Sequence, residues 1–402
     1  MRLRSILWAA LAGLAAAALL HSGALVFATL AAALLAALVV VTRRRVFRAV
    51  TFSRTPDRRV VGWGAPLEVT VTLTNAKLLP LFWLRLRDDW PLGLAPHGFT
   101  LEPARWADCQ RLTQTLSLRW YERVRRRYRV DCRQRGQYWF GPATLEAGDP
   151  FGITGAAEEL GGRESILVLP KVLDVAGLEL LEGRPLVESP APRSLARDPA
   201  ELHGTRPYAP GDPLHAVNWR ATARTGELHT DEFEPTSLAA VRLLLDVGVH
   251  QHVWQGVDPE RVELLCAVAA SLASAFAAGG HAVGLASNAR VAGDWRAVDV
   301  EPREGALDEV LETLARVIAL PPDDFAALLA AEAADESSSA DCVLVVPALR
   351  APARAELARL RAERATTVVF VGRPTEPERP LVDAVVPPDF DWRASSALTL
   401  VR

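Results

Sequence analysis

Apolar residues fill almost all of residues 6–41. This run is about twice as long as the roughly 20 residues that one membrane-spanning helix needs. It is broken once, at His21, Ser22 and Gly23, where glycine and serine suit a tight turn. The pattern therefore predicts a transmembrane helical hairpin, two antiparallel helices that are each short for a full membrane span.

Basic residues stand at both outer ends of the apolar run: Arg2, Arg4, Arg43, Arg44, Arg45 and Arg48. Positive charge at the outer ends, with none in the turn, places both ends of the hairpin in the cytoplasm. A cleaved signal peptide is the alternative, but it does not account for a second apolar run followed by four arginines. We therefore expect a multi-pass protein of the inner (cytoplasmic) membrane, with the bulk of the chain in the cytoplasm.

Residues 46–170 contain several short runs in which apolar and polar positions alternate. Within residues 66–75, every second residue from Leu67 to Leu73 is apolar, and the residues between them are Thr or Glu. Residues 112–120 alternate in a similar way. Short strands that follow one another without helices predict a β-sandwich domain.

Arginine occupies most odd positions of residues 123–135, beginning with Arg123, Arg125, Arg127 and Arg129. Side chains alternate across a strand, so these arginines point to the same side. Two interpretations are open: a solvated face that protects an edge strand from aggregation, or a dock for anionic lipid headgroups beside the membrane anchor. Nucleic acid is not an expected partner, because few aromatic residues accompany the arginines.

Residues 236–402 alternate between short apolar runs and helical patterns. Residues 241–246 form the first apolar run, and Asp258 and Pro259 then predict the start of a helix. Further apolar runs, each next to a helical pattern, lie at residues 281–286, 342–346 and 367–371. This alternation predicts an α/β domain with a parallel, doubly wound sheet.

Residues 171–235 connect these two regions and are rich in Pro, Gly, Trp, Arg and Asp. The candidate interaction residues are Tyr208, Gly211, Asp212, Trp219, Arg220 and Arg224. A tight turn at Asp212, followed by a short helix in which Trp219 is an apolar anchor, accounts for this composition. We favour a structural polar network here. The alternative is a hydrolase that uses Asp212, His215 and Arg220, although no nucleophile–base pair is evident.

This segment resembles the signature of a bacterial family called domain of unknown function 58, Tyr-x-x-Gly-Asp followed by Asp-Trp-(Lys/Arg)-x-x-Ala-Arg. The turn motifs Arg-Gly-x-Tyr and Asp-Pro-Phe-Gly at residues 135–138 and 149–152 match that family as well. Asn218 stands where the family usually has Asp, and His215 where Arg or another polar residue is common. Both departures remove charge from the segment.

The resemblance implies a von Willebrand factor A-like C-terminal domain and a MoxR-type AAA+ ATPase as partner, in chaperone-like or envelope functions. In such a domain a loop Asp-x-Ser-x-Ser helps to hold a divalent ion, but Asp246, Gly248 and His250 occupy those positions here. Residues 345–349 also lack the later Thr-Asp-Gly motif. A hard cation needs several oxygen ligands, so we expect no metal and no cofactor. A transition metal on His250 and His252 is the less favoured alternative.

The 402 residues carry a net charge of -3, which excludes a globally basic nucleic-acid binder. The four cysteines show no zinc spacing, and we expect buried, reduced thiols rather than a Cys109–Cys132 bridge. No phosphate-binding glycine loop and no Gly-x-Ser-x-Gly motif is present.

We therefore expect a membrane-anchored, non-enzymatic scaffold or adaptor. The expected regions are a hairpin at 1–45, a β-sandwich at 46–170, a linker with the signature at 171–235 and the A-like domain at 236–402.

Overall fold

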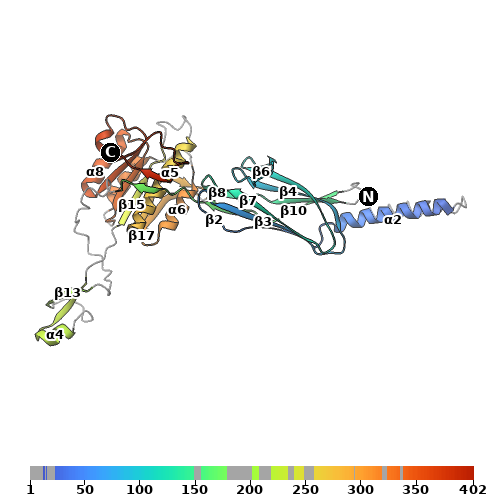
Figure 1. Cartoon of the computed structure of the whole chain (residues 1–402), viewed down its shortest axis with the longest axis horizontal. Coiled ribbons are helices and arrows are strands. Elements are labelled where there is room, and N and C mark those ends of the chain that lie inside the picture. Colours follow the sequence, from blue (N-terminus) through green and yellow to red (C-terminus); the bar gives the residue numbers. More distant parts are fainter. Residues whose placement is uncertain are drawn as a thin grey trace. The chain divides into compact units, whose positions relative to one another are not determined.

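The computed structural model describes residues 12, 13, 15, 23–148, 155–178, 202–207, 219–233, 240–248, 258–293, 295–318, 324–335 and 338–402. Helices and strands are mixed, and the chain divides into two compact units, Met1–Leu169 and Pro170–Arg402 (Figure 1). We call them the β unit and the α/β unit.

Helix α2 (Gly23–Arg45) begins the continuously described part of the β unit. Its 23 residues give a length of about 35 Å. The chain then passes directly into strand β1 (Val50–Pro56), and Val46 is buried in the core of the unit. The described residue Gly13 lies against α2, since a Cβ added to it would stand 2.6 Å from Cγ2 of Thr29. Of the predicted turn at residues 21–23, Gly23 is the first residue of α2, whereas His21 and Ser22 lie outside the described residues.

One sheet of the β unit contains β1, β3 (Pro66–Asn75) and β7 (Arg123–Asp131), all antiparallel. The alternation predicted for residues 66–75 is confirmed, because the apolar residues from Leu67 to Leu73 are buried. Strand β7 is an edge strand of this sheet. It ends at Asp131, and Arg135 beyond it is buried rather than part of the exposed arginine run.

A second sheet has the order β10-β9-β4-β6-β5. Its strands are β4 (Leu81–Pro91), β5 (Glu102–Pro103), β6 (Cys109–Leu118), β9 (Ala143–Gly148) and β10 (Gly155–Leu160). A third has β2 (Val60–Val61), β11 (Glu164–Val168) and β8 (Gly136–Phe140). Side chains from all three sheets share one core, in which Trp90 packs edge-on against Phe140. The N-terminal region is therefore β-rich, as predicted.

The α/β unit is built on a sheet with the order β17-β16-β15-β19-β20-β21. These strands are β15 (Ala240–Leu245), β16 (Ala282–Val291), β17 (Ala297–Arg303), β19 (Asp341–Val346), β20 (Thr366–Val371) and β21 (Ala384–Val386). All are parallel except β17, which pairs antiparallel with β16 at one edge. Leu243, Leu244 and Leu245 are all fully buried, so both faces of the sheet are covered.

The covering helices are α5 (Pro259–Ala278), α6 (Leu307–Arg316), α7 (Phe325–Ala334) and α8 (Ala351–Glu363), with a 3-10 turn at Arg379–Leu381. Helix α5 begins as predicted, because the side chain of Asp258 accepts a hydrogen bond from the backbone N–H of Arg261. Helix α6 ends at Arg316, because Val317–Ile318 form a short strand β18 that pairs with β16.

By length and composition, one described helix could cross a membrane, and it is α5. Most of α5 is buried, and Leu265, Ala269 and Leu272 are completely enclosed. This packing is typical of a core helix. Helix α2 contains a shorter apolar stretch, Gly23–Ala37. These helices support membrane association weakly.

The segment predicted as a linker begins with residues that pack on the α/β unit. Strand β12 (Asp174–Ala176) pairs with β22 (Ala397–Thr399), and Lys171 donates hydrogen bonds to three backbone carbonyls of residues 392–395. Further along, β13 (Leu202–Pro207) pairs with β14 (His229–Phe233), and helix α4 (Trp219–Thr225) lies between them in sequence.

Candidate functional site

The central strands β15 and β19 run parallel side by side, but the chain leaves them in opposite directions across the sheet, toward β16 and toward β20. In open α/β sheets, ligands bind beyond the carboxyl ends of the strands at such a reversal of strand order. Asp246 follows β15, and Arg350 follows β19. We call the residues around these two strand ends the carboxyl edge.

The carboxylate of Asp246 is buried at this edge and is held by hydrogen bonds. Its Oδ1 accepts from the backbone N–H of Gly248 at 2.7 Å and from Nδ2 of Asn288 at 2.8 Å. The same amide of Asn288 accepts from the N–H of Val247 at 3.0 Å. Burial raises the pKa of Asp246 to about 6, although these hydrogen bonds and the nearby charge of Arg350 act to lower it.

The guanidinium of Arg350 supplies positive charge at this edge. Its Nη2 donates to the carbonyl of Gly248 at 2.9 Å. A Cβ at Gly248 would lie 2.8 Å from Oδ1 of Asp246 and 3.2 Å from Nη1 of Arg350. The close approach of Asp246 and Arg350 therefore requires glycine at this position. A serine at position 248, as in the metal-binding motif, would crowd both side chains.

Two further side chains hold the neighbouring strand ends together. Arg261, near the start of α5, donates to the carbonyl of Val371 at 3.2 Å. Glu378 accepts from the backbone N–H groups of Leu349 and Thr375, each at 2.7 Å. Burial would raise the pKa of Glu378, but these hydrogen bonds outweigh it and lower the pKa. The edge is therefore a pre-organised surface, and exposed residues such as Arg373 border it.

In the described part of the chain, no three or more His, Cys, Asp or Glu residues come together in a cluster that could hold a metal ion. Of the three motif positions, Asp246 and Gly248 are described as above. His250, like His252, lies outside the described residues. The one acidic motif position that is described already accepts two hydrogen bonds.

The signature residues are placed in part. Tyr208, Gly211 and Asp212 lie outside the described residues. Trp219, Arg220 and Arg224 lie on helix α4. The side chain of Trp219 is 69% exposed, so it is not the buried anchor that the sequence suggested. Both arginines are exposed as well.

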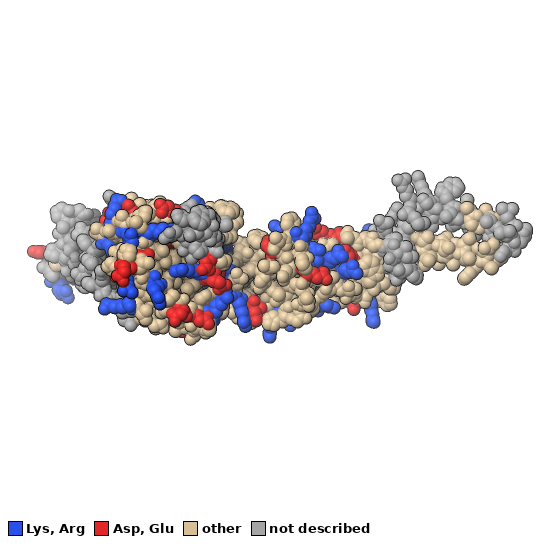
Figure 2. Space-filling view, turned by 90° about the horizontal axis from the view of Figure 1, so that it is seen from above, with Lys and Arg blue, Asp and Glu red and all other residues tan. Residues whose placement is uncertain are grey.

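The arginine run has the predicted geometry. Arg123, Arg125, Arg127 and Arg129 are all exposed on the edge strand β7. Arg127 faces Glu68 of the neighbouring strand at 3.6 Å. Figure 2 shows Lys and Arg mixed with Asp and Glu on the face in view, rather than one broad basic surface. All four cysteines are buried and free, and no Cys109–Cys132 bridge forms.

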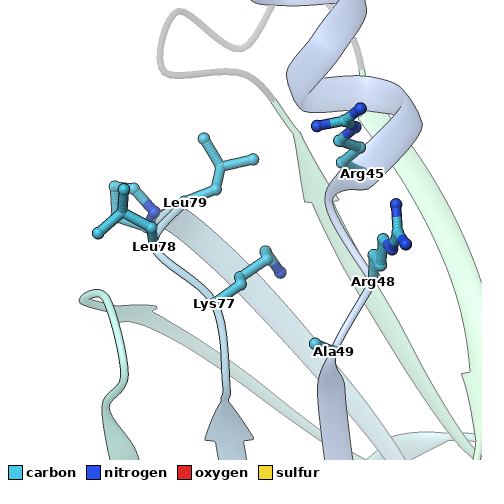
Figure 3. Close-up of a pocket in the computed structure, with 7 residues that line it drawn as sticks. Arg45, Arg48, Ala49, Lys77, Leu78 and Leu79 are labelled. Carbon is cyan, nitrogen blue, oxygen red and sulfur yellow. The ribbon is translucent and has the colours of Figure 1, made fainter.

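Sequence reasoning missed a basic pocket of about 490 Å³ in the β unit, next to the end of α2 (Figure 3). Its lining residues are Arg45, Arg48, Ala49, Lys77, Leu78, Leu79 and Pro80. They come from two segments separated by more than one strand, so no local motif indicates the pocket. The only local signal is the cluster of arginines after the apolar run.

Residues 204–391 match a family model described as "Protein of unknown function DUF58". The match includes α4 and the carboxyl edge, and it agrees with the resemblance inferred from the signature. A curated relative, "Uncharacterized protein YeaD" from Bacillus subtilis (strain 168), is 26% identical over 248 residues, which are 60% of this chain. This chain spans 56% of that relative's length.

Similarity to solved structures is slight. A CARDB domain from Pyrococcus furiosus is 14% identical and has a TM-score of 0.21, covering 30% of this chain and 87% of its own. A cohesin module from Clostridium perfringens is 10% identical with a TM-score of 0.20, covering 30% of this chain and 97% of its own. Scores this low carry no conclusion about fold or function.

Proposed function

We propose that this protein is a membrane-anchored, cytoplasm-facing scaffold or adaptor without enzymatic activity, which binds a protein partner through the carboxyl edge. The observation that carries the proposal is the closed arrangement of Asp246, Asn288 and Arg350. Oδ1 of Asp246, the side-chain amide of Asn288 and Nη2 of Arg350 are each held by hydrogen bonds to one another or to backbone groups. Such an edge is suited to holding a fixed shape for a partner rather than to turning over a substrate.

A von Willebrand factor A-like assignment for the α/β unit is supported by its topology. Numbering its main strands in chain order gives 3-2-1-4-5-6 across the sheet, a doubly wound order with a switch point between the first and fourth strands. Asp246 directly follows the first strand, where the motif of that domain places its aspartate. The crowding around Gly248 favours a form that has Arg350 in place of a metal ion.

The partner we propose is a MoxR-type AAA+ ATPase. Support for it is the resemblance of the signature to the DUF58 family together with the match of residues 204–391. The hydrolase alternative depends on Asp212 and His215, which lie outside the described residues. No observation on the described residues favours it.

The anchoring part of the proposal rests on the apolar residues 6–41. Residues 24–41 of α2, before its arginines, span about 27 Å, which is slightly short of a hydrocarbon layer of about 30 Å and fits a locally thinned bilayer. Residues 23–37 of α2 include no charged residue. The close packing of Gly13 on Thr29 is typical of helix pairs in membranes and supports a hairpin. Arginines at its outer ends favour a cytoplasmic location for both units.

The test is co-purification of the ATPase with the full-length chain from native membranes. Arg373, two residues after β20, is exposed at the carboxyl edge. Glu363 is exposed three residues before the same strand, at its opposite end, and serves as a matched control. Arg373→Glu should lower recovery of the ATPase about tenfold, because an unfavourable charge at an interface weakens binding strongly.

Glu363→Arg should leave recovery of the ATPase unchanged. If unmodified protein recovers no MoxR-type ATPase, the assigned partner is wrong. If both variants lower recovery equally, the carboxyl edge is not the contact surface.

One further function has a specific observation in its favour. The exposed arginines of β7 could bind anionic lipid, because they stand on an edge strand with their charges on one side. The lipid-binding experiment below includes Arg125 and Arg127 as its control pair and therefore tests this function too.

A further inference from the structure

Three loops meet at the end of the β unit where α2 joins it. The backbone N–H of Ala76 donates to the carbonyl of Ala49 at 2.8 Å. The N–H of Tyr121 donates to the carbonyl of Lys77 at 3.2 Å. Asn75 closes the arrangement, since its Nδ2 donates to the carbonyls of Leu79 and Arg119. The basic pocket therefore has a backbone that is held in place before any ligand binds.

The polar lining of the pocket is cationic. Arg45 and Arg48 approach from the α2 side, and Lys77 reaches toward them from the facing loop (Figure 3). Among the described residues that line the pocket, none carries a carboxylate. Nζ of Lys77 donates to the carbonyl of Val46 at 2.6 Å, which occupies one of the three N–H donors of an ammonium group. Burial lowers the pKa of Lys77 to about 8, so the group remains mostly charged at pH 7.

Large apolar side chains are exposed at the same end of the unit. Leu78 is 73% exposed, Trp120 61% and Tyr121 68%. Aromatic side chains of this kind, with an apolar body and a polar tip, concentrate at membrane–water interfaces. This end of the β unit thus combines basic side chains with exposed aromatic and aliphatic ones, next to an apolar helix. Such a combination is suited to contact with the headgroup layer of a membrane.

We propose that this pocket binds the phosphate of an anionic phospholipid in the leaflet that α2 enters. Arg45, Arg48 and Lys77 hold the phosphate, and Leu78 and Trp120 lie among the neighbouring lipids. This inference rests on the proposed membrane anchoring by α2. It adds that the pocket at the base of α2 binds an anionic phospholipid. The site orients the β unit on the membrane surface.

The arginine run on β7 is a different surface. In the sheet register, Arg123 pairs with Thr74 at the pocket end, whereas Asp131 pairs with Pro66 at the far end. Arg129 lies about 20 Å along the strand from Arg123. Arg125 and Arg127 lie about 7 and 13 Å along the strand from Arg123 and provide a control pair with the same charge as Arg45 and Arg48.

The test is native mass spectrometry of the full-length chain in detergent with added phosphatidylglycerol or phosphatidylcholine. Unmodified protein should retain phosphatidylglycerol preferentially. The double variant Arg45→Gln/Arg48→Gln should weaken that retention by about tenfold or more, because each arginine near an anionic headgroup contributes substantially. The control Arg125→Gln/Arg127→Gln should retain phosphatidylglycerol as the unmodified protein does. Inorganic phosphate at the same concentration should not displace the lipid.

Equal retention of the two lipids by unmodified protein would overturn the proposal, as would equal losses in the two double variants. Displacement by inorganic phosphate would overturn the assignment to a lipid. A loss confined to the β7 variant would place lipid binding on the arginine strand instead.

Membrane retention of all three proteins after alkaline carbonate washing is measured in parallel. Release of the unmodified protein by the wash would contradict anchoring itself, whereas retention with unchanged lipid preference would contradict the pocket alone.

Discussion

At the scale of single residues, burial raises the pKa of two aspartates to about 6. Asp88 lies in the core of the β unit, where Arg54 and the indole N–H of Trp90 contact its carboxylate. Asp246 lies at the carboxyl edge of the α/β unit. In both, desolvation is the largest influence and the hydrogen-bonding partners offset part of it. The two groups therefore link the stability of each unit to pH.

Asp246 gives a prediction about pH. Because its pKa in the folded state lies above the ordinary value of 3.8, the folded state binds the proton more tightly than the unfolded state. The stabilisation from this group is complete below about pH 4 and is lost as the pH rises through about 6. Asp246→Asn keeps the hydrogen-bond acceptor and removes the charge. The variant should gain about 2–3 kcal/mol relative to the unmodified protein between pH 4 and pH 7.

The measurement is hydrogen–deuterium exchange of β15 peptides in both proteins at several pH values. Comparison at each pH cancels the intrinsic pH dependence of exchange. A constant difference in protection from pH 4 to pH 7 would show that Asp246 does not titrate in this range.

At the scale of elements, the sequence predicted those helices and strands whose ends or buried faces are determined by residues close together in the chain. Helix α5 was predicted from Asp258 and Pro259, which set its first turn. Strand β3 was predicted from its period of two. Strand β17 was not predicted from the sequence. It pairs antiparallel with the preceding strand β16 at the edge of the sheet. Pro302 packs so closely on Gly284 of β16 that a larger residue at position 284 would clash with it.

In the candidate sites, too, features set by nearby residues were predicted and contacts between distant segments were not. Asp246 was recognised from its position after an apolar run. Its companions Asn288 and Arg350 come from other strand ends, so only the folded sheet brings them together. The basic pocket likewise needs residues 45–49 and 76–80 to meet. Contacts between distant segments were beyond sequence patterns because no local periodicity encodes them.

Helix α5 yields a prediction at this scale. Ser271 is completely buried in it, and its Oγ accepts a hydrogen bond at 2.9 Å from the backbone N–H of Leu173. Ser271→Ala would leave that buried donor without its acceptor and should cost about 1–2 kcal/mol. Exchange of the peptide containing Leu173 should accelerate about tenfold.

Ser274, half-buried on the same helix, provides the control. Ser274→Ala should change exchange at Leu173 little. Equal acceleration in both variants would mean that Ser271 acts through general helix stability rather than through its bond to Leu173.

At the scale of the whole molecule, each unit has a core of its own. A chain built in this way can combine an anchored part and a binding part without one distorting the other. The proposed work is divided accordingly, with lipid contact at the base of α2 and partner contact at the carboxyl edge. The central claim is that the carboxyl edge touches a MoxR-type AAA+ ATPase.

Site-specific photocrosslinking in native membranes tests this claim most directly. A photoreactive amino acid replaces Arg373 in one full-length protein and Glu363 in another, which marks the two ends of β20. The account predicts a crosslinked product that contains the ATPase from position 373 and none from position 363. A product of equal yield from both positions, or an ATPase crosslink from position 363 alone, would contradict it.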